Sequence, residues 1–211
     1  MAALHHVLRF VAGTVGQGIL LHASTQLTLQ GYSDSDWASC PNTRRSITGF
    51  LMLFGSSPIS WKSKKQGTTS KSSSETEYRA MSAAASKITW LVKLLQELGV
   101  SDLLPVKLNC DNQAAIHIGK NPVFHERTKH IEIDCHFTRY KVLEGLIELC
   151  FVPSSDQLAD LFTKPLSAAH HMEMCSKLGL IDTQSPSSLR GVLQIPDCAS
   201  SALVATSESL L

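Results

Sequence analysis

The chain has 211 residues, of which 43% are apolar, and its 19 basic and 18 acidic side chains give a formal net charge of +1. This composition is typical of a globular protein and excludes a collagen-like fibre, a coiled coil and disorder throughout. Charged, His, Gly or Ser residues interrupt every apolar run, so no stretch approaches the roughly 18 apolar residues that predict a membrane helix. We therefore expect one domain together with additional sequence.

The near-neutral net charge conceals an uneven distribution. Between Pro41 and Lys93 the chain has nine basic residues against two acidic residues, a local balance of +7 that leaves −6 for the rest. A basic segment favours contact with phosphate groups, and the alternative is a solvated face without a ligand.

The six cysteines are widely separated and form no Cys-x-x-Cys pair. A chain of this length buries a core without disulfides, and nothing in it resembles a secretory signal. The even count leaves three disulfides as the alternative, but we expect reduced cysteines and an intracellular, cytoplasmic protein.

The first half of the sequence predicts three strands and a long helix. The strands are expected over residues 27–35, 46–54 and 59–63, with Gly55 to Pro58 as the turn between the second and the third. Residues 62–74 are basic and rich in Ser and Thr, which predicts an exposed loop. A stripe of apolar residues from Tyr78 to Leu95, at alternating steps of three and four, then predicts a helix that Gly99 ends.

The second half continues with alternating strands and short helices. Val106, Leu108 and Cys110 alternate with polar residues, which predicts a half-buried strand that ends at an acid. A short helix through Ile118, a helix over 129–144, a strand over 146–152 and a short helix over 156–164 follow. Beyond Pro165 the periodicity weakens, and from Asp182 to Leu211 we expect a loosely ordered tail.

Four acidic residues lie where predicted elements meet loops, and they are Asp34, Glu77, Asp111 and Asp160. When each acid is considered by itself, an ordinary structural role explains its position. Asp34 would belong to a turn, and Asp111 to a turn or a helix cap. Glu77 would close a capping box with Ser74, and Asp160 would pair with Lys164 one turn later.

Glu77 fits its structural explanation least well. At helical spacing it aligns with Met81, Ala84 and Ile88 at the edge of the buried stripe, so its carboxylate points toward the sheet. Buried and clustered carboxylates are costly unless a cation compensates them. Divalent metal ions would resolve that conflict.

Seven segments together resemble one known family. They are GYSDSDWA (31–38), TRRSITG (43–49), SWKSKKQ (60–66), ETEYRA (75–80), CDNQAA (110–115), RTKHIEI (127–133) and QLADLFTKPL (157–166). In this order they are similar to the ribonuclease H domain of copia-type retrotransposon Pol polyproteins, and the chain looks like a truncated genomic fragment of such an element. Residues 1–26 look like the end of the preceding reverse transcriptase region, which leaves 27–166 for the ribonuclease H-like domain and 167–211 for a partly disordered tail.

The resemblance implies a fold, a site and a reaction. The fold is α/β, a five-stranded mixed sheet with its first three strands antiparallel, flanked by helices. Asp34, Glu77, Asp111 and Asp160 become both the catalytic acids and the metal ligands, with Asp34 preferred over Asp36 because the family pattern puts the catalytic acid first. The activity implied is endonucleolytic hydrolysis of the RNA strand of RNA/DNA hybrids.

The cofactor expected is a pair of Mg²⁺ ions, with Mn²⁺ as a substitute, because the proposed ligands are all hard oxygens. The partners implied are the RNA/DNA hybrid and the reverse transcriptase region of the parent polyprotein. An active element would place the protein in a virus-like particle.

Residues expected to contact nucleic acid come from the resemblance and from the basic segment. They are Gln113, which matches a family position at the minor groove, with Ser35, Ser73, Ser74, Asn112, Arg44, Arg45, Lys62, Lys64 and Lys65. For the three tryptophans, core packing is expected before stacking on bases. His125, His130 and His136 match no usual zinc spacing, so we expect no zinc site there.

The loop before the last acid leaves the activity open. Cellular ribonucleases H carry a histidine in the loop before the last acid, whereas residues 151–156 of this chain contain none, so turnover is in doubt. A fragment that folds without turning over, as a nucleic-acid-binding or structural remnant, is the main alternative. An integrase on the same fold is disfavoured by the spacing of the acids.

Overall fold

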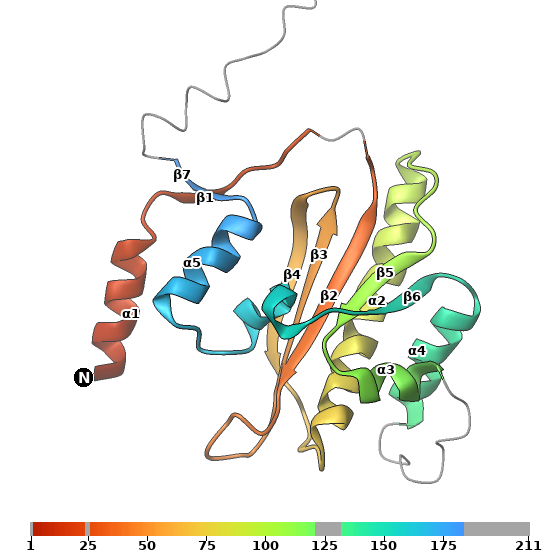
Figure 1. The fold of residues 1–211 in the computed structure, drawn as a ribbon, viewed down its shortest axis with the longest axis horizontal. Coiled ribbons are helices and arrows are strands. Elements are labelled where there is room, and N and C mark those ends of the chain that lie inside the picture. The colour runs from red at the N-terminus through yellow and green to blue at the C-terminus, as the bar shows by residue number, and fades with distance from the viewer. Residues whose placement is uncertain (1, 24–25, 121–131, 184–211) are drawn as a thin grey trace, which may run out of the picture. The chain divides into compact units, whose positions relative to one another are not determined.

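The computed structural model describes residues 2–23, 26–120 and 132–183 (Figure 1). The predicted tail from residue 184, His125, His130 and most of the segment 127–133 lie outside the described residues. The chain divides into two compact units, one formed by residues 19–179 and the other by residues 1–18 with the segment from residue 180.

The larger unit is built on a five-stranded mixed sheet, as predicted. Its strands are β2 (Leu29–Asp36), β3 (Ile47–Phe54), β4 (Ser57–Lys65), β5 (Val106–Cys110) and β6 (Ile147–Phe151). The sheet order is β4-β3-β2-β5-β6; β2, β3 and β4 pair antiparallel, and β5 runs parallel to β2 and β6. The predicted α/β class and the antiparallel pairing of the first three strands are confirmed.

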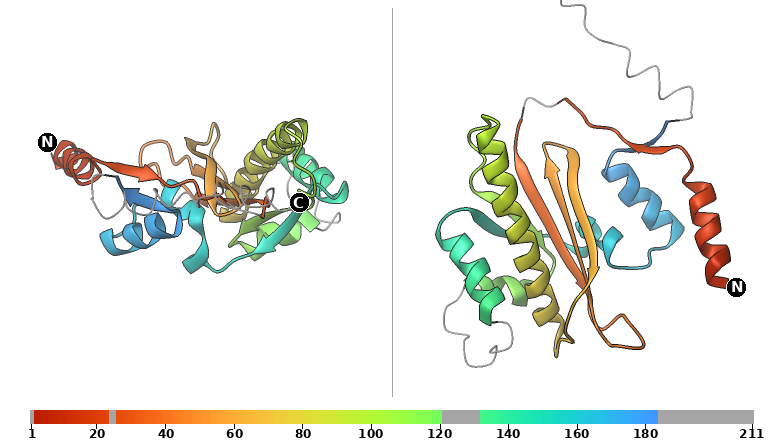
Figure 2. Two further views of the ribbon diagram at one scale, coloured as in Figure 1. Left: turned by 90° about the horizontal axis from the view of Figure 1, so that it is seen from above. Right: turned by 180° about the vertical axis from the view of Figure 1, so that it is seen from behind.

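The long predicted helix is α2 (Ser73–Glu97), and it packs against β2, β3 and β5. Its apolar stripe is fully buried, including Tyr78, Met81 and Ile88. The view from behind in Figure 2 shows α2 lying along the sheet, with α4 (Glu132–Leu143) beside it. Helix α3 (Gln113–Lys120) packs against α2 and α4.

The opposite face of the sheet is covered by η4 (Leu158–Phe162), against which α5 packs. The short helix predicted over 156–164 is this 3₁₀ helix, preceded by a second 3₁₀ helix, η3 (Ser154–Asp156). η4 packs against β2 and β3. A Cβ on Gly31 would face Ile88 of α2, whereas a Cβ on Gly49 would face η4, so the two helical layers lie on different sides.

Helix α5 (Ala168–Lys177) was not predicted. It lies in the segment 167–211 expected to be a tail, yet Met174, Cys175 and Leu178 are buried and α5 packs against η4. Part of that segment is therefore folded.

The smaller unit contains α1 (Ala2–Gly13) and a two-stranded sheet of β1 (Gln17–Ile19) and β7 (Leu180–Asp182). Thr183 Oγ1 donates a hydrogen bond of 2.6 Å to the Gly16 carbonyl and holds the two segments together. The apolar side chains of α1, such as Leu4, Val7 and Phe10, are more than half exposed.

The prediction for the tryptophans is wrong, whereas the prediction for the cysteines is confirmed. Trp37, Trp61 and Trp90 are each about half exposed, so the predicted core packing is wrong for all three. The five cysteines within the described ranges are free thiols, as expected. No helix among the residues described is long and apolar enough to cross a membrane.

Candidate metal and catalytic site

Two of the predicted acids come together because their strands are neighbours. Asp34 lies near the end of β2, and Asp111 directly follows β5, which pairs parallel with β2. The carboxyl ends of parallel strands meet at one edge of a sheet, which is the usual place for a ligand site in a fold of this class.

The other two acids reach this edge from the two helical layers. Glu77 comes from the first turns of α2, and Asp160 comes from η4 on the opposite face. Carboxylate oxygens of Asp34, Asp111 and Asp160 lie within 4.8 Å of one another. A second group, Glu77, the Cys110 thiol and Asp111, meets the same limit, so Asp111 joins all four acids into one cluster.

Glu77 is held by β2 rather than by its own helix. Its Oε1 accepts hydrogen bonds from the Ser35 backbone N–H at 3.1 Å and from the Ser35 hydroxyl at 3.0 Å. The helix is instead capped by Ser72, whose hydroxyl accepts from the Glu75 N–H, while Glu75 accepts from the Lys71 N–H. The structural explanation of Glu77 as a capping residue is therefore wrong.

Burial sets the electrostatics of Glu77. Its side chain is only 5% exposed, and burial together with the charges of Asp34 and Asp111 raises its pKa to about 8, against the lowering effect of Ser35. With a pKa of about 8, this carboxyl is mostly protonated at neutral pH unless a cation compensates its charge.

Asp34 is the most deeply buried acid of the cluster, with 1% of its surface exposed. The Thr163 hydroxyl donates to its Oδ2, and Lys164 Nζ lies 3.3 Å from its Oδ1. Burial raises the pKa of Asp34 to about 6 although both of these contacts lower it. Asp36, the other candidate at this position, is less buried and lies outside the cluster as defined among the described residues.

Asp160 has the partner that its structural explanation required, and it also belongs to the cluster. Lys164 Nζ lies 2.8 Å from Asp160 Oδ1 and bridges it to Asp34. The pairing of Asp160 with Lys164 and its place in the carboxylate cluster therefore occur together.

Sequence reasoning missed Gln157 and Thr163 as residues that position the acids. The Gln157 side chain is fully buried; its Nε2 donates to the Ser33 carbonyl at 3.0 Å and its Oε1 accepts from the Ala159 N–H. It thus joins η4 to β2 beside Asp34. The segment 157–166 that resembles the family contains both residues, but a polar side chain gives no sign of burial in sequence.

Asp111 is less enclosed than the other acids. Its Oδ2 accepts a hydrogen bond of 2.9 Å from the Ser154 hydroxyl of η3. The helix-cap role belongs to Asn112, whose Oδ1 accepts from the Ala115 N–H. Because Asn112 caps the helix, the carboxylate of Asp111 is not needed for capping and can serve as a metal ligand.

The cluster has the chemistry of a divalent cation site. Its carboxylates are hard oxygen donors of the kind that Mg²⁺ and Mn²⁺ prefer, and two of them are raised in pKa by burial without a metal. Lys164 places a positive charge between Asp34 and Asp160.

The residues expected to contact nucleic acid differ in their exposure to solvent. Ser73, Gln113, Arg44 and Arg45 are exposed, and Ser74 and Asn112 are partly exposed. Ser35 differs, because it is buried and its hydroxyl contacts Thr76 and Glu77. In this structure its hydroxyl positions Glu77, and the expected contact with nucleic acid stays a prediction.

Three of the predicted lysines lie around a basic pocket. A hollow of about 550 Å³ between β4 and α2 is lined by Lys62, Lys64, Lys65 and Arg79, together with Thr48, Gln66, Gly67, Thr68, Ser82, Ala83, Ser86 and Asp134. In the strand register, Asp34 pairs with Gly49 and Gly49 pairs with Ser63. Lys62 and Lys64, on either side of Ser63, therefore lie two strands away from Asp34 at nearly the same position along the strands. At about 4.8 Å per strand this is a separation on the order of 10 Å between backbones.

The fold is shared with a solved ribonuclease H. The structure of LC11-RNase H1, isolated from compost by a metagenomic approach, superposes with a TM-score of 0.51 over 65% of this chain and 93% of that one, at 13% sequence identity. At this identity the similarity establishes the ribonuclease H-like fold alone.

The relatives by sequence are transposon polyproteins. The chain is 43% identical over 193 residues to a retrovirus-related Pol polyprotein from transposon RE2 of Arabidopsis thaliana, and 43% identical over 180 residues to that from transposon RE1. These matches cover 92% and 85% of this chain but only 13% and 12% of the relatives. A third, from transposon TNT 1-94 of Nicotiana tabacum, is 35% identical over 83% of this chain and 13% of its own length.

The homologues of this chain are thus retrovirus-related Pol polyproteins from copia-type transposons, and the chain corresponds to about an eighth of their length. No family model matches it.

Proposed function

We propose that this chain is the ribonuclease H of a copia-type element and hydrolyses the RNA strand of RNA/DNA hybrids by a two-metal mechanism. The observation that carries the proposal is the convergence of Asp34, Glu77, Asp111 and Asp160 at one edge of a ribonuclease H-like sheet. Pol polyprotein homologues support it, because ribonuclease H activity belongs to the reaction that copies RNA into DNA.

The four acids would hold two Mg²⁺ ions, with Mn²⁺ able to substitute. Such ions, when bound, activate the attacking water and neutralise charge on the phosphate and the leaving oxygen during in-line displacement. The residues of the chain provide fixed oxygen ligands. Ser35 orients Glu77, Thr163 and Gln157 join η4 to β2, and Ser154 orients Asp111.

Recognition of a hybrid requires contact with the 2′-OH of one strand and with the backbone of the other. Gln113, Asn112, Ser73 and Ser74 lie beside the site, at the start of α3 and of α2, where they are accessible. Lys62, Lys64 and Lys65 offer charges for phosphates, and Arg44 and Arg45 lie in the neighbouring exposed loop.

The proposal also includes the organisation of the chain. Residues 1–26 would be the end of a reverse transcriptase region and residues 27–166 the ribonuclease H domain. The exposed apolar side chains of α1 are consistent with a helix that the reverse transcriptase region covers in the polyprotein.

The test is cleavage of labelled RNA/DNA hybrid by the purified chain, beside duplex RNA and duplex DNA, in Mg²⁺ and in EDTA. We expect cutting of the hybrid alone, in Mg²⁺ alone, and a loss of about a thousandfold in rate in Asp111→Asn, equivalent to ~4 kcal/mol of transition-state stabilisation. Asp102→Asn, a matched change in an exposed loop before β5, is expected to cut like the wild type.

Tight hybrid binding by a folded wild-type chain that cuts nothing in Mg²⁺ or Mn²⁺ would contradict the proposal. That result would favour a nucleic-acid-binding remnant. Circular dichroism and thermal unfolding of each variant establish that a lost activity is not a lost fold.

A further inference from the structure

A lysine side chain lies among the acids of the candidate site. Lys164 Nζ is 2.8 Å from Asp160 Oδ1 and 3.3 Å from Asp34 Oδ1, and both acids are nearly inaccessible to solvent. The ammonium group therefore lies between two of the three carboxylates that are within 4.8 Å of one another.

The ammonium and a divalent cation need the same atoms. A Mg²⁺ ion binds carboxylate oxygens directly at about 2.1 Å, so an oxygen engaged by the ammonium is not fully available to the metal. Asp34 and Asp160 lie in a region where an uncompensated charge is costly, and Lys164 compensates them in the metal-free chain.

The side chain has a path away from the acids. Lys164 is 34% exposed, whereas the side chains of Asp34 and Asp160 are 1% and 8% exposed. Its backbone N–H donates to the Asp160 carbonyl, so the backbone is fixed while four flexible methylene groups carry the charge. Rotation of these groups moves the ammonium into solvent without moving η4.

We propose that Lys164 is a displaceable cation that occupies the Asp34–Asp160 position in the metal-free protein and leaves it when a divalent ion binds. This inference rests on the proposed metal site. Lys164 keeps the acids close together before loading, and it weakens metal affinity because each binding event must first displace it.

The first experiment uses the unmodified chain. The rate of acetylation of each lysine by an N-hydroxysuccinimide ester is measured by mass spectrometry in EDTA and in saturating Ca²⁺, which binds without requiring turnover. We expect Lys164 to react several-fold faster in Ca²⁺, while Lys177, whose partners Asp156 and Glu173 lie outside the cluster, reacts equally in both.

The second experiment measures Ca²⁺ binding by calorimetry. Lys164→Met and Lys164→Gln remove the competing cation, and we expect both to bind Ca²⁺ about three- to tenfold more tightly than the wild type, a gain of up to ~1.4 kcal/mol. Lys177→Met makes the same change in net charge away from the site and should bind within about twofold of the wild type.

The outcomes separate the inference from the proposed function. Wild-type binding with equal or weaker binding in both Lys164 variants, and no change in Lys164 acetylation, would overturn the inference and leave the metal site in place. Absence of Ca²⁺, Mg²⁺ and Mn²⁺ binding in every form would overturn the metal site and the inference with it. Because the acetylation experiment needs no variant, it decides the matter even where a substitution impairs folding.

Discussion

Three of the four acids of the cluster, Glu77, Asp34 and Asp111, accept a hydrogen bond from a hydroxyl group of another element. Ser35 of β2 donates to Glu77 of α2, Thr163 after η4 donates to Asp34 of β2, and Ser154 of η3 donates to Asp111. These small hydroxyl groups fix the direction of these carboxylates, which is what a metal site with defined geometry requires.

The raised pKa values of Asp34 and Glu77 predict how the stability of the metal-free protein varies with pH. Burial raises the two pKa values to about 6 and about 8, so between pH 4 and 8 the folded state binds more protons than the unfolded state. This contribution to stability is fully present below about pH 4 and is lost as pH rises through 6 and then 8, at up to ~1.4 kcal/mol per pH unit for each group.

Urea unfolding in EDTA between pH 5 and 9 measures this slope. Glu77→Gln should be more stable than the wild type at pH 8 and flatten the upper part of the profile, whereas Glu148→Gln, an exposed acid on β6, should leave it unchanged. Saturating Mg²⁺ should also flatten the profile. If the free energy of unfolding of the wild type rises from pH 5 to 8 in EDTA, burial does not raise the pKa of these acids and the prediction is wrong.

At the scale of elements, the position of Asp160 depends on the contact between η4 and the sheet. Gly49 of β3 makes that contact possible, because a Cβ there would lie 2.5 Å from Thr163 Cγ2, 3.1 Å from the Ala159 carbonyl oxygen and 3.1 Å from Phe162 Cβ. The backbone partner of Gly49 across the ladder is Asp34. Any side chain at residue 49 would therefore push η4 away from Asp34.

Gly49→Ala is expected to lower the free energy of unfolding by about 1 to 3 kcal/mol through this overpacking. It should also weaken divalent-ion binding, because Asp160 moves with η4. Gly67→Ala is the matched control, since a Cβ at Gly67 has nothing within 4 Å. Urea unfolding and Ca²⁺ calorimetry check both effects. Wild-type values for Gly49→Ala would show that η4 adjusts without moving the acid.

The elements with the clearest periodicity in the sequence were the ones predicted best. The stripe from Tyr78 to Leu95 belongs to one long helix with a single buried face, and the structure places α2 there. β4 is longer than predicted and extends to Lys65, because the lysines of an edge strand form ladder hydrogen bonds while their side chains remain in solvent.

Elements that depend on distant contacts were not predictable. Only Met174 and Cys175 of helix α5 are buried, so its apolar stripe is too narrow to detect in the sequence. The helix folds because η4 offers a surface for it to pack against. The pattern Gln157-Leu158-Ala159-Asp160 predicted a helix but not its 3₁₀ form. For the site, the four acids were predicted from the resemblance. The orienting hydroxyls and the second contact of Lys164 were not, because they join segments that are far apart in the sequence.

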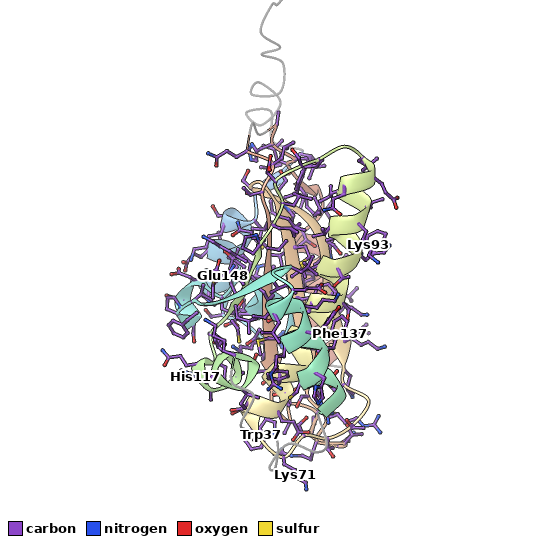
Figure 3. All side chains as sticks on the ribbon, turned by 90° about the vertical axis from the view of Figure 1, so that its right-hand side faces the viewer. Trp37, Lys71, Lys93, His117, Phe137 and Glu148 are labelled. Carbon is purple, nitrogen blue, oxygen red and sulfur yellow. The ribbon has the colours of Figure 1, made fainter. Side chains whose placement is uncertain are left out.

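At the scale of the molecule, the fold separates charges that the net charge of +1 combines. Acids gather at the carboxyl ends of β2 and β5, and basic residues gather along β4 and the adjoining surface of α2. Figure 3 shows Trp37 and Lys71 at one end of the molecule, and Lys93 well away from them along α2. An acidic site alone would repel a phosphate backbone, so the basic residues between β4 and α2 would have an electrostatic role in the proposed function.

This separation predicts that lysines differ in their effect on hybrid binding according to position. Lys64→Ala is expected to weaken binding of an RNA/DNA hybrid and to reduce the slope of log K against log salt concentration by about one, the value for one lost phosphate contact. Lys93→Ala removes an identical charge from an exposed site further along α2 and should change neither quantity by a comparable amount. Fluorescence anisotropy with a labelled hybrid at several salt concentrations, in Ca²⁺ to prevent cleavage, measures both. Equal losses in the two variants would mean that the hybrid responds to net charge alone and not to the pocket between β4 and α2.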